Sequence, residues 1–270
     1  MPILLTLAAI ITASAAFYST RAFDTAAMDA TRLEELDRKT REELLQNGWE
    51  PSSTELVPSV EGLVAKRPFR IALAHGTITA NPPEAGKLAK AREILAYELA
   101  RYPPGFLRKA RMRRVLFCED LEEDGRPIPS LPNHASTLLV DVDGSQAFLA
   151  RLVHHEVFHF LDYAEDLVVV RDPSWERLNV PDFRYEGGGR AIRDPAATAS
   201  GSGPKGFVTR YATAALEEDK AEIFSWLMTG KAILSARCID DTILRTKVDR
   251  IDAIVAAFFP GPRRPYGAWP

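Results

Sequence analysis

The chain contains an HExxH sequence, formed by His155-Glu156-Val157-Phe158-His159. On an α-helix, residues four apart lie about 40° apart around the axis and about one turn apart along it, so both imidazoles can reach one ion. Zinc accepts two imidazoles among three protein ligands. The Glu156 carboxylate would lie beside that ion, where it can take a proton from a coordinated water and pass it to a departing amine. The spacing therefore predicts a zinc site with Glu156 as its general base.

The residues around this sequence predict a helix that is buried nearly all round. Ser145 is a good N-cap, the helix would run to about Ala164, and its apolar positions are 149, 152, 153, 157, 158, 160 and 161. Buried imidazoles and carboxylates need partners, because each unpaired group costs kilocalories. A metal ion would be one such partner. His154 faces elsewhere on the helix, and we expect it to be structural, like His75 and His134.

A third protein ligand is needed, and an HExxHxxGxxH continuation does not supply it. Asp162 and Glu165 stand where that pattern has glycine and histidine. Glu218 and Glu222 are four residues apart, so they share one face of a later predicted helix. One carboxylate can bind the metal while the other accepts the N–H of a ligating histidine. We favour Glu218 as the ligand and Glu222 as the supporting carboxylate. The helix dipole alone also favours acidic residues in a first turn, and Glu217 fits that explanation.

Two segments of the chain resemble the lethal-factor-like zinc peptidases. In the first, the HExxH sequence is followed by Asp162-Tyr163-Ala164. In the second, Tyr211 precedes Glu218 by seven residues, and the pattern Glu218-x-x-Ala221-Glu222-x-Phe224 follows. The resemblance covers about residues 136–229, a third of the chain. The segment Trp175-Glu176-Arg177-Leu178-Asn179, with Phe183 and Tyr185 after it, is similar to a segment of bacterial zinc-binding metallopeptidases.

The resemblance implies a zincin-like fold of the gluzincin type and a role for each matched residue. Glu218 would be the third ligand and Glu222 the supporting glutamate. Tyr211 would donate its hydroxyl to the oxyanion that forms at the attacked carbonyl, a role that needs a neutral phenol. Phe158 departs from the family pattern, where a small residue often precedes the second histidine. A bulky side chain there could narrow the cleft.

Periodicity along the rest of the chain predicts the fold class α+β. Strands are expected within 69–78, 113–118 and 136–142, and helices at 29–46, 84–102, 214–229 and 240–258. These elements predict one domain over 67–260, with a small mixed or antiparallel sheet packed on helices. A helix and linker at 25–66 would precede it, and a Pro-rich tail at 261–270 would follow. The strand at 136–142 would be the edge on which an extended peptide pairs, and the glycine-rich loop at 172–206 could be a mobile lid.

Composition limits the classes of protein to which this chain can belong. It has 270 residues, 46% of them hydrophobic, and a net charge of −3, which argues against wholesale disorder and against a nucleic-acid partner. Two cysteines are too few for a four-thiolate zinc site. The apolar run from Ile3 to Tyr18 favours a signal peptide at 1–24, or an N-terminal anchor. We therefore expect a secreted, periplasmic or anchored protein, in which Cys118 and Cys238 either pair or stay as two buried thiols.

Together these patterns predict a zinc-dependent endopeptidase with one zinc ion. Its ligands would be His155, His159 and Glu218, its general base Glu156, and its oxyanion donor Tyr211. The expected partner is a peptide or protein substrate, with membrane contact only through an N-terminal anchor. The alternative is a non-catalytic zinc-binding or protein-interaction module on the same scaffold.

Overall fold

The computed structural model describes residues 30–52, 55–73, 76–133, 136–166, 172–192, 195–199 and 201–269. Backbone contacts divide the chain into two compact units. The first, here called the sheet unit, lies within Met1–Ala100 and Pro104–Leu149, and the second, the helical unit, comprises Arg101–Pro103 and Ala150–Pro270. The boundaries between the units, at residues 100–104 and 149–150, fall inside the single domain predicted at 67–260. The predicted signal segment at 1–24, His75 and His134 lie outside the described residues.

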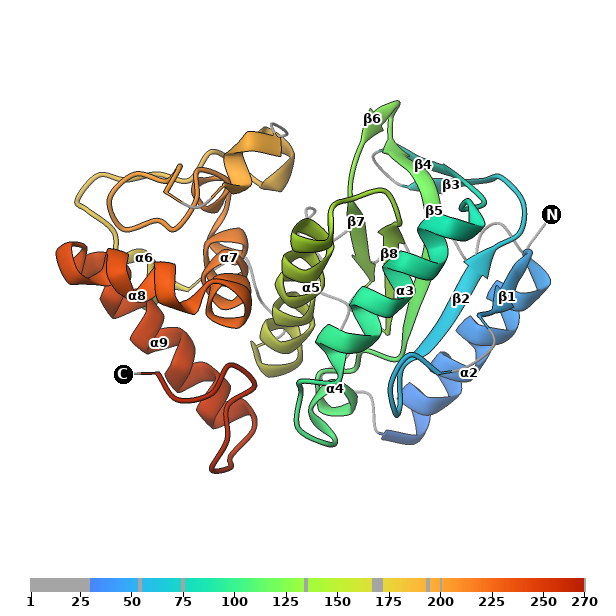
Figure 1. Cartoon of the computed structure of the whole chain (residues 1–270), viewed down its shortest axis with the longest axis horizontal. Helices are drawn as coiled ribbons and strands as arrows, with labels where there is room; N and C mark the ends of the chain where they lie inside the picture. Colours follow the sequence, from blue (N-terminus) through green and yellow to red (C-terminus); the bar gives the residue numbers. More distant parts are fainter. Residues whose placement is uncertain are drawn as a thin grey trace. The chain divides into compact units, whose positions relative to one another are not determined.

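The sheet unit contains a mixed sheet, which has eight strands among the residues described (Figure 1). The strands are β1 (Trp49–Pro51), β2 (Glu61–Ala65), β3 (Phe69–Leu73), β4 (Gly76–Asn81), β5 (Arg114–Glu123), β6 (Arg126–Pro127), β7 (Ser130–Asn133) and β8 (Thr137–Asp141). The long strand β5 is central. Its first half pairs in parallel with β2 and β8, and its second half pairs antiparallel with β4 and β6. The helices of this unit are α2 (Ala30–Gln46), α3 (Ala85–Leu99) and α4 (Phe106–Lys109).

The sequence of β5 explains its two kinds of neighbour. Val115 to Cys118 is a continuous apolar run, and all four side chains are buried, as expected for a strand with parallel partners on both sides. Leu116 stands opposite Leu63 on β2 and Leu139 on β8, so three leucines meet across three strands. They belong to the main apolar cluster of this unit, which extends from α2 to the hairpin of β3 and β4. Apolar packing around one strand thus organises the sheet.

Two predictions about this sheet need correction. The strand predicted at 136–142 is β8, and it lies between β5 and β7, so it is not an edge along which a peptide could pair. The sequence missed β7 because Pro132 and the turn residues before it masked a short strand. The segment predicted as a helix and linker, 25–66, also contributes β1 and β2 to the sheet.

The helical unit is built from long helices joined by irregular segments and short turns. Its helices are α5 (Gln146–Asp166), which enters the unit at Ala150, α6 (Pro173–Glu176), α7 (Leu216–Thr229), α8 (Lys231–Asp240) and α9 (Thr242–Phe258). The turns are η2 (Gly189–Ala191), η3 (Pro195–Thr198) and η4 (Tyr211–Thr213). Helix α5 begins where predicted, because Ser145 Oγ accepts a hydrogen bond of 3.2 Å from the Phe148 amide.

Helix α7 ends at a glycine for a steric reason. A Cβ on Gly230 would lie 2.3 Å from the Trp226 ring, so no side chain fits where the chain turns into α8. Helix α8 was not predicted, because the helices expected in this part of the chain were at 214–229 and 240–258. Asp241 separates α8 from α9, and its carboxylate caps α9 by accepting a 3.0 Å hydrogen bond from the Leu244 amide. The α+β class is confirmed by the described residues, whereas the zincin-like fold stays a prediction.

Three further predictions concern the cysteines, the membrane and the tail. Cys118 and Cys238 are both buried free thiols, which is the second of the two alternatives. Among the described residues, no helix combines the length and apolar character needed to cross a membrane. In the predicted tail, Tyr266 is buried and donates a 2.6 Å hydrogen bond to Asp252 on α9.

Candidate metal site

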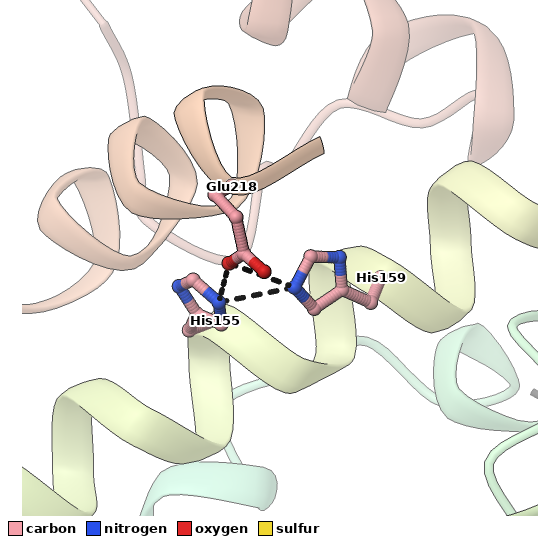
Figure 2. Close-up of side chains that lie close together, drawn as sticks. All are labelled: His155, His159 and Glu218. Carbon is pink, nitrogen blue, oxygen red and sulfur yellow. Dashed lines mark hydrogen bonds and ion pairs between the residues drawn. The ribbon is translucent and has the colours of Figure 1, made fainter. Parts of the chain in front are cut away.

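Two helices of the helical unit bring three predicted ligands to one point. His155 and His159 project from α5, and Glu218 projects from the first turn of α7 (Figure 2). His155 Nε2 lies 2.9 Å from Glu218 Oε2 and 3.0 Å from His159 Nε2, and His159 Nε2 lies 3.5 Å from the same carboxylate oxygen. All three residues are buried. They form a cluster that could hold a metal ion.

The separations of the donor atoms fit a small dication. With bonds of about 2.0–2.1 Å, neighbouring ligand atoms around a tetrahedral zinc ion lie about 3.3 Å apart. The three separations of 2.9, 3.0 and 3.5 Å bracket that value. Two imidazole nitrogens and one carboxylate oxygen are also a donor set that zinc accepts. The residues present therefore fit the metal that the sequence predicts.

A second carboxylate orients one of the histidines. Nδ1 of His155 donates a hydrogen bond of 3.0 Å to Glu222 Oε1, which leaves Nε2 directed at the other ligands. The other oxygen of Glu222 accepts a hydrogen bond of 2.7 Å from the Thr209 hydroxyl. Glu222 thus lies where the sequence places a supporting carboxylate. Thr209 was not predicted.

The electrostatics of the cluster suit a cation. Burial lowers the pKa of His155, but hydrogen bonds and charge from Glu218 and Glu222 outweigh it, so this pKa lies well above its ordinary value. Burial also lowers the pKa of His159, but the hydrogen bond and the charge of Glu218 outweigh this effect, so the pKa of His159 is raised as well. Burial raises the pKa of Glu218, yet the two histidines hold it far below its ordinary value. An ionised carboxylate therefore faces two imidazoles, and a bound dication would take the place of their protons.

The predicted catalytic side chains lie close to these ligands. Glu156 is buried, and its negative charge contributes to the raised pKa of His159. The ring of Tyr211, at the start of η4, lies 6.0 Å from the ring of His155. A Cβ added to Gly189 would lie 2.5 Å from Glu218 Oε1 and 2.7 Å from the Tyr211 hydroxyl oxygen. The Tyr211 hydroxyl and the Glu218 carboxylate therefore both approach the same face of Gly189.

The residue after Glu218 anchors a different part of the unit. Asp219 is fully buried and forms a 2.7 Å ion pair with Lys247 on α9. The same oxygen accepts hydrogen bonds of 2.9 Å from the Trp175 indole and 2.8 Å from the Tyr185 hydroxyl. Both aromatic residues belong to the segment 175–185. Asp219 therefore fixes that segment to the helix that carries Glu218.

Lys220 makes a further buried connection between the two ligand helices. Its ammonium lies 3.3 Å from Asp162 on α5 and 3.2 Å from Asp172, the N-cap of α6. Asp162 follows His159 by three residues, and Lys220 follows Glu218 by two. The ion pair therefore holds α5 and α7 together next to the candidate ligands. The sequence gives no sign of this pairing, because 58 residues separate the partners.

His154, Phe158 and Glu217 are not among the clustered ligands. His154 is buried, and its Nδ1 lies 2.8 Å from the Tyr102 hydroxyl. Phe158 is buried against Phe224 of α7, with ring centroids 5.3 Å apart, so it packs between helices. Glu217 is not among the clustered ligands, and burial, together with the charge of Glu218, raises its pKa to about 7.

Comparison of the chain with protein-family models, with curated proteins and with solved structures finds no match in any of the three. The resemblance to lethal-factor-like peptidases therefore rests on the residues of its two segments. The geometry stands independently of that resemblance: His155, His159 and Glu218 form a buried group that could bind a metal ion.

Proposed function

We propose that this protein is a zinc-dependent endopeptidase with a lethal-factor-like, zincin-type catalytic site. One observation carries the proposal: the HExxH histidines and a glutamate from a separate helix converge within 4.8 Å of one another. The HExxH spacing and the shared helix face of Glu218 and Glu222 predict the same three ligands from the sequence. Three protein ligands, rather than four, are typical of catalytic zinc sites.

Each ligand and its support have a defined task in this proposal. His155, His159 and Glu218 would hold the ion, and Glu222 would keep the His155 ring aimed at it through Nδ1. A bound zinc ion would lower the pKa of a coordinated water to about 7 and polarise the peptide carbonyl. The proposed metal is zinc because imidazole and carboxylate donors at these separations suit it.

Two further side chains would move protons and stabilise charge. The Glu156 carboxylate would accept the proton of the attacking water and deliver it to the nitrogen of the departing amine. The Tyr211 hydroxyl would donate a hydrogen bond to the carbonyl oxygen of the peptide as negative charge develops there. The nearness of Glu156 to His159 and of Tyr211 to His155 supports these roles.

The substitution Glu156→Gln tests the proposal. We expect the variant to bind one zinc per chain, like the wild type, and to cleave a peptide library at least about a hundredfold more slowly, as is usual when a general base is lost. Glu176→Gln is the matched control, because Glu176 is an exposed glutamate on α6. Cleavage by Glu156→Gln at the wild-type rate would remove Glu156 from the mechanism.

A non-catalytic zinc module is the second candidate, and the burial of the ligands favours it. The exposed fractions are 6% for His155, 7% for His159 and 6% for Glu218, which is also what a closed structural site would have. The same experiment separates the two candidates. One zinc per chain without cleavage by the wild type would support the module, whereas cleavage that depends on Glu156 would support the peptidase.

A further inference from the structure

We propose that Thr209 is a positioning residue for the metal site, and that its hydroxyl acts through Glu222 to orient His155. This inference rests on the metal site of the proposed function and not on peptide cleavage. Thr209 is fully buried, two residues before Tyr211 in the chain, and its hydroxyl bonds to Glu222, which is not one of the clustered ligands. Its effect on a metal would therefore pass through one intermediate carboxylate.

The first part of the argument is the chain of hydrogen bonds. Thr209 Oγ1 donates to Glu222 Oε2 at 2.7 Å, and Glu222 Oε1 accepts from His155 Nδ1 at 3.0 Å. Each oxygen of the Glu222 carboxylate thus has its own donor. A carboxylate that is held at both oxygens cannot rotate about its terminal bond without losing one of them. The orientation of the His155 ring depends on that restraint.

The second part is the direction of the Thr209 hydroxyl proton. A hydroxyl has one proton to donate and lone pairs with which to accept. Thr209 Oγ1 also lies 3.1 Å from the Ala212 amide, which can only donate, so the hydroxyl accepts there. Its proton is left for the Glu222 carboxylate, which can only accept when ionised. The two bonds are therefore compatible and define the rotamer of Thr209.

The third part is the backbone that carries Thr209. The Arg237 guanidinium on α8 donates to the carbonyl oxygens of Phe207 and Val208. The Gly206 amide donates to Asp241 at 2.7 Å, and the Gly206 carbonyl accepts from Lys247 at 2.8 Å. Four hydrogen bonds from α8, α9 and the residue between them thus hold the three residues before Thr209. Removal of the Thr209 hydroxyl should leave this backbone in place.

Substitution of Thr209 by valine and by serine distinguishes the effect of the hydroxyl group from the effect of the side-chain shape. Thr209→Val keeps the branched shape but leaves Glu222 Oε2 buried without its donor, so the carboxylate is free to turn away from His155. Thr209→Ser keeps the hydroxyl and loses only a methyl group. Loss of a group that orients a ligating histidine costs about 10–100-fold in metal affinity. Because Thr209 acts through Glu222, we expect the lower end of this range.

The control is a second buried threonine with a similar hydrogen bond. Thr213 is buried, and its Oγ1 lies 3.0 Å from a carboxylate oxygen of Glu186 and 2.8 Å from the Arg210 carbonyl oxygen, so its one proton can be donated to either acceptor. Glu186 is exposed and is not one of the clustered ligands. Thr213→Val therefore removes a buried hydroxyl from the same segment without touching the connection to His155.

The experiment measures zinc affinity by competition with a chelator, using the full chain and its Thr209→Val, Thr209→Ser and Thr213→Val variants. We expect Thr209→Val to bind zinc about tenfold more weakly, and the other two to stay within about threefold of the wild type. The visible absorption of the cobalt-loaded protein should change for Thr209→Val alone, because a turned imidazole alters the ligand field. Thermal unfolding of the metal-free chains verifies that each variant is folded.

Three results would overturn the inference. Wild-type zinc affinity in Thr209→Val would show that the hydroxyl does not act on the site. An equal loss in Thr209→Ser, or in Thr213→Val, would show that the effect comes from packing of the segment. A wild-type chain that binds zinc but cleaves no peptide would contradict the proposed peptidase and leave the inference about Thr209 standing, so the two failures are distinguishable.

Discussion

Both compact units bury many apolar side chains, but they differ in how many charged groups they bury. In the sheet unit, the apolar cluster around β5 forms the core, and ion pairs such as Arg38–Glu42 and Lys39–Glu35 lie on exposed faces. Arg114, which is buried beside Asp37, and Glu123, which is also buried, are exceptions. In the helical unit, α7 buries three consecutive charged residues, Glu218, Asp219 and Lys220, each with a charged or ionisable partner.

This difference matters for function. Apolar contacts stabilise a core without a strong preference for direction, and cores tolerate repacking when their volume is kept. Buried ion pairs and hydrogen bonds are directional, and the loss of one partner is costly. A metal site needs donors held within a fraction of an ångström. The helical unit, which holds the candidate ligands, is the one that buries more of these directional charged interactions.

The largest effect is expected from breaking the buried pair of Asp219 and Lys247. Both side chains are 0% exposed, so Lys247→Met leaves a carboxylate buried without its counter-charge. We expect the free energy of unfolding to fall by about 3–5 kcal/mol. Urea unfolding followed by tryptophan fluorescence measures it, because Trp175, Trp226 and Trp269 all lie in the helical unit.

The matched control is Lys39→Met in the sheet unit. Lys39 pairs with Glu35 at 2.7 Å, but both side chains are more than half exposed. An exposed pair on one helix contributes about 0.3–0.5 kcal/mol. Similar costs for the two lysine variants would refute the contrast between the units.

A methyl group at Gly189 should weaken metal binding. Its carbon would lie 2.5 Å from Glu218 Oε1 and 2.7 Å from the Tyr211 hydroxyl oxygen, and both distances are too short, so these side chains or the backbone at Gly189 must shift. We expect Gly189→Ala to lower zinc affinity by about tenfold or more, since overpacking costs about 1–3 kcal/mol. Equilibrium dialysis against zinc measures the change. Gly261→Ala is the control, because no atom lies within 4 Å of its added carbon, and a weakened control would contradict the steric explanation.

Asp172 provides a test in which pH matters. Burial raises its pKa, but hydrogen bonds from Ser174 and Trp175 and the charge of Lys220 outweigh this and lower the pKa to about 2. A carboxyl whose pKa is depressed on folding stabilises the fold above its unfolded pKa of about 3.9. That stabilisation is lost as the pH falls towards about 2.

The substitution Asp172→Ala should therefore have an effect that depends on pH. We expect it to destabilise the protein by about 1 kcal/mol at pH 7, as the loss of an N-cap does. The difference from the wild type should shrink between about pH 4 and pH 2. Urea unfolding at several pH values measures it, and a difference that stays constant down to about pH 2 would contradict this assignment.

The smallest difference between the two units is expected in the reactivity of their cysteines, which thiol labelling measures in each unit separately. Cys118 lies in the sheet unit and Cys238 in the helical unit. Burial raises the pKa of Cys118 well above its ordinary value and that of Cys238 to about 11, so few thiolates exist at pH 7.5. Native protein should react slowly at both. Unfolded, unreduced protein should react at two sites, and fewer than two would indicate a disulfide.

The sequence predicted those parts of the molecule whose pattern is local. The HExxH helix, the cap at Ser145 and the apolar first half of β5 follow from spacing within one element. Glu218 and Glu222 were found because they share one face of a helix, and the structure places them at His155. Local periodicity reports which face of an element is buried.

The missed features all depend on partners far apart in the sequence. Nothing near Asp219 indicates that Lys247 will meet it, because 28 residues separate them. Thr209 resembles any other threonine until its hydroxyl is seen on Glu222. The position of β8 inside the sheet also depends on β7, a short strand interrupted by proline. Such partners come together only when the whole chain has folded, so the pattern of a single sequence does not reveal them.

The order of charges along α7 limits how that helix can be turned. Rotation by one residue is about 100°, and it would bring Asp219 towards the histidines and Lys220 towards the ammonium of Lys247. Two buried ammonium groups would then face each other. Only one angular setting of α7 satisfies all its charged neighbours at once, and in that setting Glu218 faces the imidazoles. The ion pairs of Asp219 and Lys220 thus fix the rotation of α7 about its axis and, with it, the direction of the Glu218 side chain. Substitutions at these two residues would therefore change the affinity for an ion that they do not contact.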